Sequence, residues 1–256
     1  RRVAQIEVPS PPSSIPLGAI FDSSKKTPLA TAVRTNKFSA AATIYSLGVE
    51  RIHYGGDPIK MISPSIEFDL SNLGWEQDYM WNICNAASSD SWMSTNTPSR
   101  DAVILTRGER NRDHSLAEEG IGMHSNLGLT FDLDEIRDAG GMKGERLIFV
   151  CDRAGIDDCH FGSPHSSVYM VALVMDNESV HAAAVNGKPV EVAQRSGTWR
   201  VSSPIGDPLA ADGRFATFRV PLPPEARYLT LLTTSAGDGI NFDDAVWSGA
   251  RLEIER

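Results

Sequence analysis

The 256-residue sequence has few cysteines, no basic cluster and an excess of acid over base. It contains 3 cysteines, so at most one disulfide can form, and a chain of this length can fold around a core without disulfide staples. The formal net charge is −9. We therefore expect neither nucleic acid nor an anionic membrane as a partner, because both need basic patches that replace counterions.

Long apolar segments are also missing. No run approaches the roughly 18 apolar residues of a membrane-spanning helix, so we expect no membrane insertion. No segment combines the charged start and apolar middle of a secretory signal, and the chain begins RRVAQIEV. We expect a processed or excised part of a larger protein that is extracellular, periplasmic or on the cell surface.

The sequence lacks the motifs of the common enzyme classes. It has no GxSxG elbow, P-loop, HExxH motif or GxGxxG after a strand. A glycoside hydrolase needs two carboxyl groups about 5 to 9.5 Å apart across its substrate. Adjacent strand residues point to opposite faces, so neither Asp157 with Asp158 nor Asp243 with Asp244 supplies such a pair. We expect no enzymatic activity, and a glycosidase with carboxyls from distant segments is the less favoured alternative.

The patterns that are present predict an all-β fold. Short alternating segments are bounded by Gly, Pro, Asn or Asp, and the 21 glycines and 15 prolines are dispersed, as in many short strands joined by turns. Phe218 and Val220 should face inward, between Thr217 and Arg219. Only LDEIRDAGG predicts a helix, with Gly140 as its C-cap. The expected strands span 66–70, 101–106, 128–133, 146–152, 168–176, 188–193, 216–222, 228–234 and 251–255.

The chain is predicted to have two parts. Residues 1–65 form an N-terminal extension that includes PSPPSSIP, a proline and serine stretch typical of a linker or tail. Residues 66–256 form a β-sandwich. The sequence leaves open whether the extension is the remnant of a neighbouring domain or adds strands to the sandwich.

An acidic turn follows the strand at 228–234. Within AGDGINFDDAVW lie Asp238, Asn241, Asp243, Asp244 and Trp247. Carboxylates, an amide and an indole offer hydrogen-bonding groups and a flat apolar face, which a sugar ring or a hard cation needs. The alternative is a tight turn in which Asp and Asn bond the local backbone, with the tryptophan in the core.

Two separated blocks carry a family resemblance. GIGMHSNLGLTFDL at 120–133 and AGDGINFDDAVWSGARL at 236–252 resemble the paired signatures of the NPCBM family of carbohydrate-binding modules, and LSNLGW at 70–75 is similar to the family's opening strand. The resemblance covers residues 66–256. It implies a jelly-roll β-sandwich of the galactose-binding-domain-like kind, appended to secreted glycoside hydrolases. Met123 and Ser125 depart from the family's GIGTHA pattern, so the surroundings of His124 should differ.

These features together predict a non-catalytic, lectin-like module that binds galactose-type or related glycans, with an appended catalytic domain as a further partner. A sugar hydroxyl both donates and accepts, so its site needs rigidly held polar groups and one aromatic ring. Structural alternatives are a core position for His124 or Trp247 and a turn-capping role for Asp238. The predicted ligand-binding residues are His124, Asp238, Asn241, Asp243 and Trp247, with Trp199 and Trp92 as alternative platforms.

Calcium is the expected cofactor. The resemblance implies a structural ion, and an Asp-rich loop provides oxygen ligands. The predicted ligands are Asp238, Asp243 and Asp244.

The cysteines allow two interpretations. Cys151 and Cys159 flank DRAGIDD and could pair across a hairpin, or all three thiols, Cys84 included, could be buried as small hydrophobes. A zinc site at Cys151, Cys159, His160 and His165 is disfavoured, because CHFGSPH lacks paired CxxC spacing.

A third class of function is a protein adhesion or assembly domain. Its interface would then be the N-terminal extension and the loop at 157–167, which is inserted where compact members of the resembled family would have a short hairpin. A glycan site should show an exposed aromatic ring in a polar setting, whereas a protein interface should show a larger apolar patch.

Overall fold

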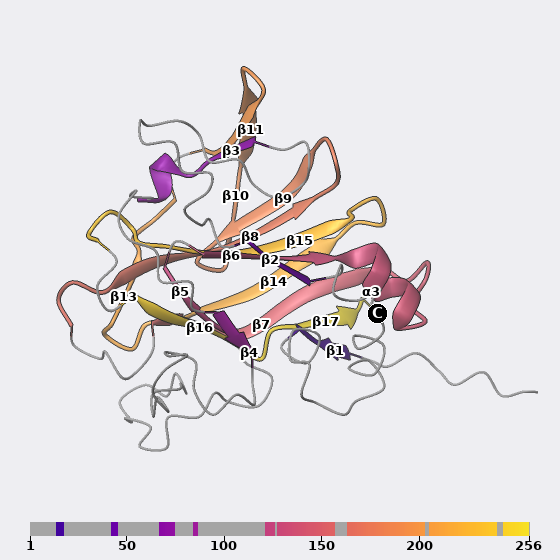
Figure 1. Ribbon diagram of the computed structural model, residues 1–256, viewed down its shortest axis with the longest axis horizontal. Helices are drawn as coiled ribbons and strands as arrows, with labels where there is room; N and C mark the ends of the chain where they lie inside the picture. The colour runs from indigo at the N-terminus through magenta and orange to yellow at the C-terminus, as the bar shows by residue number, and fades with distance from the viewer. Residues whose placement is uncertain are drawn as a thin grey trace, which may run out of the picture.

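The structure, a computed structural model, describes residues 14–17, 42–45, 67–74, 84–86, 121–125, 127–156, 163–202, 205–239 and 243–255. These residues form two seven-stranded sheets, packed face to face, and one three-stranded sheet (Figure 1). The predicted all-β sandwich is confirmed. The strand predicted at 101–106 lies outside the described residues.

The first sheet is built around β7, which pairs with β14 along one edge and with β17 and β16 along the other. Its order is β1-β17-β7-β16-β5-β4, with β14 added on β7. In β14, Phe218 and Val220 are buried while Thr217 and Arg219 are exposed, as their alternation predicts. The strands are β1 (Ser14–Pro16), β4 (Cys84–Ala86), β5 (Ile121–His124), β7 (Leu147–Ile156), β14 (Ala216–Leu222), β16 (Asp244–Ser248) and β17 (Arg251–Ile254).

The second sheet has the order β10-β9-β8-β15-β6-β2, with β13 paired to the start of β8. Its central strand β8 is apolar because both of its faces are covered. Asn186 and Gly187, with φ of 48° and 76°, close the β9–β10 hairpin in the manner of a type I′ turn. The strands are β2 (Ala42–Tyr45), β6 (Leu127–Asp132), β8 (Ser167–Met175), β9 (Val180–Val185), β10 (Lys188–Val190), β13 (Leu209–Ala210) and β15 (Tyr228–Thr234).

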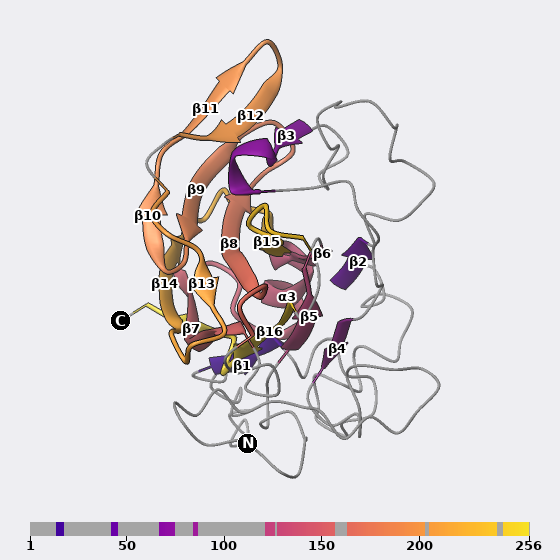
Figure 2. The ribbon, with the colours of Figure 1, turned by 90° about the vertical axis from the view of Figure 1, so that its left-hand side faces the viewer.

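A third sheet lies on the outer face of the second and creates a second core (Figure 2). It contains β3 (Glu67–Asp69), β11 (Val192–Arg195) and β12 (Thr198–Val201), and the 3₁₀ helix η1 (Ser71–Leu73) follows β3. The main core lies between the two large sheets and the second core lies under β3, β12 and η1. The strand predicted at 188–193 is therefore wrong as one element, since β10 and β11 belong to different sheets.

Parts of the first 65 residues belong to the sandwich. β1 pairs with β17, and β2 pairs with β6. Ile15 and Leu17 are buried in the main core, and the Leu17 N–H donates to the Ala250 carbonyl at 2.9 Å. These two described pieces of the N-terminal extension thus add a strand to each large sheet.

The helix α3 (Leu133–Ala139) closes the end of the sandwich at which β6 finishes. The Asp132 carboxylate caps its first turn by accepting the Asp134 N–H at 3.0 Å. At its other end the Met142 N–H donates to the Arg137 carbonyl at 2.8 Å across left-handed Gly141, which is a Schellman arrangement with Gly140 in the predicted C-cap position. Among the described residues, no helix has the length and apolar character needed to cross a membrane.

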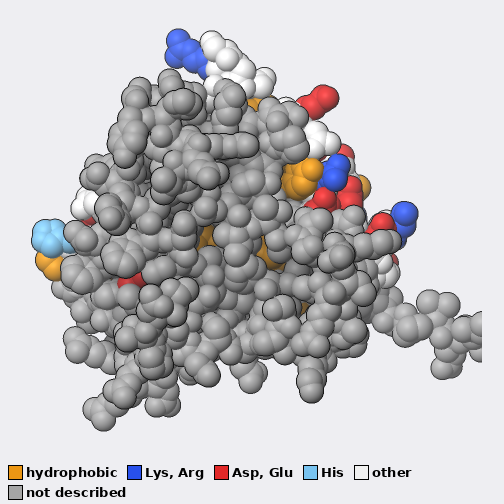
Figure 3. Space-filling model, viewed as in Figure 1, with side chains coloured by type: hydrophobic (Ala, Val, Ile, Leu, Met, Phe, Trp, Pro, Cys, Tyr) orange, Lys and Arg blue, Asp and Glu red, His pale blue; other side chains and the backbone are white. Residues whose placement is uncertain are grey.

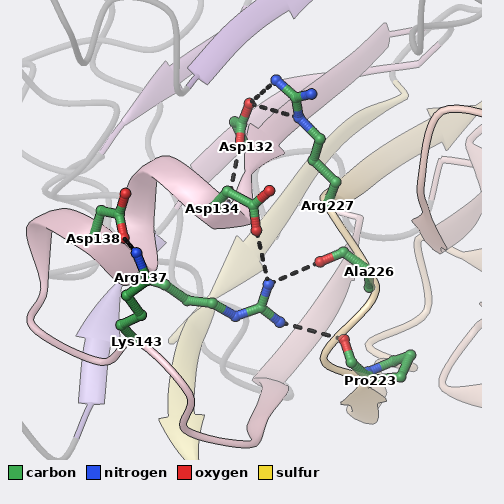
Figure 4. A network of polar contacts seen from close by, with 8 residues as sticks. All are labelled: Asp132, Asp134, Arg137, Asp138, Lys143, Pro223, Ala226 and Arg227. Carbon is green, nitrogen blue, oxygen red and sulfur yellow. Dashed lines mark hydrogen bonds and ion pairs between the residues drawn. The ribbon is translucent and has the colours of Figure 1, made fainter.

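Arg137 fastens α3 to the loop before β15 (Figure 4). Its guanidinium is buried and donates to the carbonyls of Ala226 at 2.8 Å and Pro223 at 3.3 Å, while Asp134 accepts from it at 3.3 Å. By contrast, the nearby pair of Lys143 and Asp138 is exposed, with N···O at 3.7 Å. Along the right-hand edge of Figure 3, basic and acidic side chains lie next to one another.

We expect Arg137→Met to lower the free energy of unfolding by about 2 kcal/mol, because it leaves buried carbonyls without their donor. Lys143→Met is the matched control and should change it by less than about 0.5 kcal/mol, since exposed ion pairs contribute little. Urea denaturation of both variants measures the free energy of unfolding. An equal loss of stability in the two would contradict a stabilising role of the buried Arg137 hydrogen bonds.

Candidate functional site

The three sequence segments that carry the family resemblance meet at one end of the sandwich. β5, from GIGMH, pairs with β16, from DAVWS, in the register that places His124 opposite Asp244. η1, from LSNLGW, lies against the turn between β15 and β16, where the Thr234 hydroxyl donates to the Leu73 carbonyl at 2.7 Å. The Ser235 hydroxyl donates to the Gly74 carbonyl at 2.9 Å. This end faces the viewer in Figure 2, opposite the α3 end.

Ser167, at the start of β8, holds two carboxyl groups at this end. Its hydroxyl donates to Asp238 Oδ2 at 2.7 Å, and its backbone N–H donates to Asp243 Oδ1 at 3.1 Å. The Ser125 N–H donates to the Asp243 carbonyl at 3.1 Å and ties the end of β5 to the same point. We call Asp238, Ser167, Asp243 and Ser125 the polar end.

The two carboxyl groups of the polar end differ in exposure. Asp238 is exposed, whereas Asp243 is 0% exposed. Asp243 Oδ2 is buried and has no hydrogen bond of good geometry among the described residues. Asp238 can therefore meet a ligand, and Asp243 supports it from below.

Burial raises the pKa of Asp243 to about 9. The negative charges of Asp238 and Asp244 raise it further, while the Ser125 hydroxyl and the Ser167 N–H favour the charged form and oppose the shift. Asp243 is thus protonated at neutral pH, and Asp238 is the exposed carboxyl group of the polar end.

The pairing of a neutral and an ionised carboxyl resembles a glycosidase acid and base, but the geometry does not fit that chemistry. Both carboxyls of a glycosidase must face the scissile bond. Asp243 is completely buried, so it cannot approach a substrate. The polar end can bind hydroxyl groups through Asp238 and Ser167, and it shows no acid–base pair open to a sugar.

The predicted calcium ligands do not form a cage. Within the described ranges, no three His, Cys, Asp or Glu side chains group so that they could hold one metal ion. Ser167 already bonds one oxygen each of Asp238 and Asp243. The prediction that Asp238, Asp243 and Asp244 together ligate an ion is therefore wrong as a three-residue set, whereas calcium binding itself stays a prediction.

The prediction that Trp247 binds sugar is wrong, because Trp247 is a core residue. It is 0% exposed and packs with Phe218 and Phe149 at ring-centroid distances of 5.0 and 6.2 Å. Alternation explains this position, since Ala245 and Trp247 both point from β16 into the main core. An indole with no exposed face cannot stack on a pyranose.

The remaining predicted residues are Trp199, Asn241, Trp92 and His124. Trp199 is half-buried in β12 and packs on the second core, with its indole nitrogen buried. Asn241 and Trp92 lie outside the described residues, as does the side chain of His124. Their predicted roles stay predictions.

Cys151 is a free, buried thiol in β7, so the disulfide to Cys159 is not formed. Its Sγ donates to the carbonyls of Arg153 and Ser248, each at 3.3 Å, and burial raises its pKa well above the ordinary range. The buried-thiol interpretation holds for this residue. Cys159, His160 and the Cys84 side chain lie outside the described residues.

Sequence reasoning missed Ser167, which connects the two carboxyls. It lies at the end of the insertion-like segment before β8, in SPHSS, and no motif distinguishes it from its neighbours. Only the pairing of β8 with β13 and β15 places it beside Asp238 and Asp243.

No family model matches the chain, so membership of the NPCBM family stays a prediction. No curated protein matches it either.

Among solved structures, the chain is similar to carbohydrate-binding CBM51 modules. One is CBM51-2 with INT domains of Clostridium perfringens ZmpB in complex with GlcNAc, at 20% identity and a TM-score of 0.35, covering 57% of this chain and 24% of that chain. Another is CBM51 of Clostridium perfringens GH95 in complex with methyl-galactose, at 18% identity and a TM-score of 0.39, covering 72% of this chain and 97% of that chain. A third is the tandem CBM51 modules of Sp3GH98 from Streptococcus pneumoniae SP3-BS71, at 18% identity and a TM-score of 0.35, covering 58% of this chain and 37% of that chain. The chain thus spans about a quarter of the first of these proteins.

Proposed function

We propose that this chain is a non-catalytic carbohydrate-binding module of the NPCBM kind, part of a larger secreted or cell-surface protein. The observation that carries the proposal is the meeting of the three resembling segments at the polar end. There β5 pairs with β16, η1 contacts the end of β15, and the turn between β15 and β16 carries an exposed carboxylate that accepts a serine hydroxyl.

The polar end suits recognition of sugar hydroxyls. A sugar hydroxyl donates one hydrogen bond, so it needs an acceptor held in place. Asp238 supplies acceptor oxygens and Ser167, whose hydroxyl hydrogen is donated to Asp238, supplies a further acceptor; their mutual bond at 2.7 Å fixes both before any ligand arrives. Fixed groups lose little conformational entropy on binding, which favours affinity.

The proposed ligand is a galactose-type or related glycan, following the family resemblance. Catalysis is not proposed, because the second carboxyl of the polar end is buried. Calcium remains a proposed structural ion whose ligands would include at most part of the acidic turn.

The test is a glycan array of the protein with and without calcium, followed by titration calorimetry with galactose and with the array glycan that is bound most tightly. Asp238→Asn and Ser167→Ala should each weaken binding about tenfold, because the first replaces a charged acceptor with a neutral amide and the second removes the hydroxyl that holds Asp238 in place.

Asp138→Asn, an exposed carboxylate at the α3 end, is the matched control and should bind like the unaltered protein. Failure of the folded protein to bind any glycan would overturn the proposal and favour the protein-assembly alternative. Binding that survives both polar-end changes would move the site elsewhere.

A further inference from the structure

Ala236, two residues before Asp238, has a backbone conformation that alanine rarely adopts. Its φ is 53°, and Gly237 follows with a φ of 90°. The Asp238 N–H donates to the Ser235 carbonyl at 3.4 Å, so these four residues form a β-turn whose two central residues have positive φ, as in type I′. Glycine, asparagine and aspartate dominate such positions, because in the left-handed region a Cβ atom lies too close to the following carbonyl oxygen.

The surrounding structure holds this strained residue in place. The Ala236 side chain packs on the second core. Its backbone lies directly on Gly74, where an added Cβ atom would come within 2.3 Å of Ala236 Cα and 2.2 Å of the Gly237 nitrogen. The Ser235 hydroxyl donates to the Gly74 carbonyl at 2.9 Å, which fixes the preceding residue to the same point. Backbone strain of this kind persists only where the surrounding contacts determine the conformation, and it is concentrated at binding sites.

The strained turn leads to the exposed carboxylate of the polar end. Ser235 is completely buried and Asp238 is exposed, so the turn carries the chain from the interior to the surface. The turn defines the Asp238 backbone, and the Ser167 hydroxyl holds its side chain through Asp238 Oδ2 at 2.7 Å. A carboxylate fixed at both points loses less conformational entropy when a ligand binds.

A second turn has the same backbone without these contacts. At the tip of the β11–β12 hairpin, at the top of Figure 2, Ser196 and Gly197 have φ of 53° and 89° between the paired Arg195 and Thr198. Ser196 is exposed, and a Cβ atom at Gly197 would meet nothing within 4 Å. The two turns thus share their strained conformation, but only the turn of Ala236 is packed against η1 and joined to the polar end.

We infer that Ala236 is a positioning residue of the glycan site, an inference that rests on the proposed function. It acts on a ligand only through Asp238. Its methyl group anchors the turn on the second core, and its left-handed backbone directs the chain so that Asp238 meets the Ser167 hydroxyl. Glycine fits the same φ without strain but with more conformational freedom, so alanine at this position makes the turn more rigid.

The test is Ala236→Gly, measured by titration calorimetry with galactose and with the glycan that the array shows to be bound most tightly. Affinity should fall about fivefold, because glycine gives the turn more freedom. The melting temperature should change by less than about 4 °C, because relief of the backbone strain offsets the lost methyl packing. The matched control is Ser196→Gly, which removes a side chain at the same φ in the other turn and should leave glycan affinity unchanged.

A double-mutant cycle with Asp238→Ala tests whether Ala236 acts through the carboxylate. Adding Ala236→Gly to Asp238→Ala should weaken binding by less than about twofold, since no carboxylate is then left for the turn to position. A general structural role of Ala236 would instead add the full fivefold loss, within about twofold, in both backgrounds.

Unaltered affinity in Ala236→Gly, while the parent protein binds glycan, would overturn the inference and leave the proposed function standing. Equal weakening in Ser196→Gly or additive losses in the cycle would also overturn it. Loss of folding in Ala236→Gly would do the same, because the inference requires that glycine fits this turn. A parent protein that binds no glycan would remove the proposed function as well.

Discussion

Replacing Gly74 with alanine is expected to lower the free energy of unfolding by about 3 kcal/mol or more. A Cβ atom at this position would come within 2.0 Å of the Ala236 carbonyl carbon and 2.2 Å of the Gly237 nitrogen. Both are backbone atoms, so no flexible side chain can give way. The turn that carries Asp238 and the 3₁₀ helix η1 would have to separate.

Gly141→Ala is the matched control. Gly74 and Gly141 have nearly the same left-handed φ, 68° and 66°, and each ends a helix, but a Cβ at Gly141 would meet nothing within 4 Å. It should therefore cost only the backbone strain, about 1 kcal/mol. Denaturant unfolding of the two variants separates steric conflict from strain.

Gly74→Ala should also weaken glycan binding beyond its effect on the folded fraction, because η1 positions the turn before β16 through Thr234 and Ser235. Equal losses of stability in Gly74→Ala and Gly141→Ala would show that η1 does not support this turn.

The strands that are clearly bounded by turn residues are predictable from the sequence. β14 and β15 match the predicted segments 216–222 and 228–234 residue for residue. β14 alternates against the main core, whereas β15 is buried on both faces and packs on both cores. The helix at 133–139 is likewise predictable from its apolar spacing and its two glycines.

Elements that depend on distant partners are not predictable in this way. β7 continues to Ile156, past the expected end at 152, because β14 and β16 pair with its second half and override the weak strand preference of Gly155. The segment 188–193 keeps Val190 and Val192 on the same second core while passing from one sheet to another, so alternation alone cannot show the break.

The candidate site also contains features that are predictable from the local sequence and features that depend on distant partners. Asp238 and Asp243 are predictable, since a polar turn between two strands identifies them as surface or support residues. Their connection through Ser167 is not, because 71 and 76 residues separate the partners.

Folding stability is expected to fall as pH rises between about 4 and about 9, because of Asp243. Its pKa is about 9 in the folded protein, against about 3.9 for an aspartate in an unfolded chain. Between these values the folded state binds more protons than the unfolded state, so each pH unit lowers the free energy of unfolding by up to about 1.4 kcal/mol. The contribution is complete below the unfolded pKa and is lost as pH passes the folded pKa.

Asp243→Asn should flatten this dependence, because the amide is neutral throughout and its oxygen can still accept the Ser167 N–H. Urea denaturation at pH 5, 7 and 9 measures the difference in slope between the variant and its parent, since the other titrating groups are common to both. Asp138→Asn, which alters an exposed carboxylate, should leave the slope of the parent protein unchanged.

The same series with calcium and with a chelator distinguishes protonation of Asp243 from binding of a metal ion. A slope that calcium abolishes in the parent would show that a cation neutralises Asp243. Equal slopes in Asp243→Asn and its parent, with or without calcium, would contradict the raised pKa of this carboxyl.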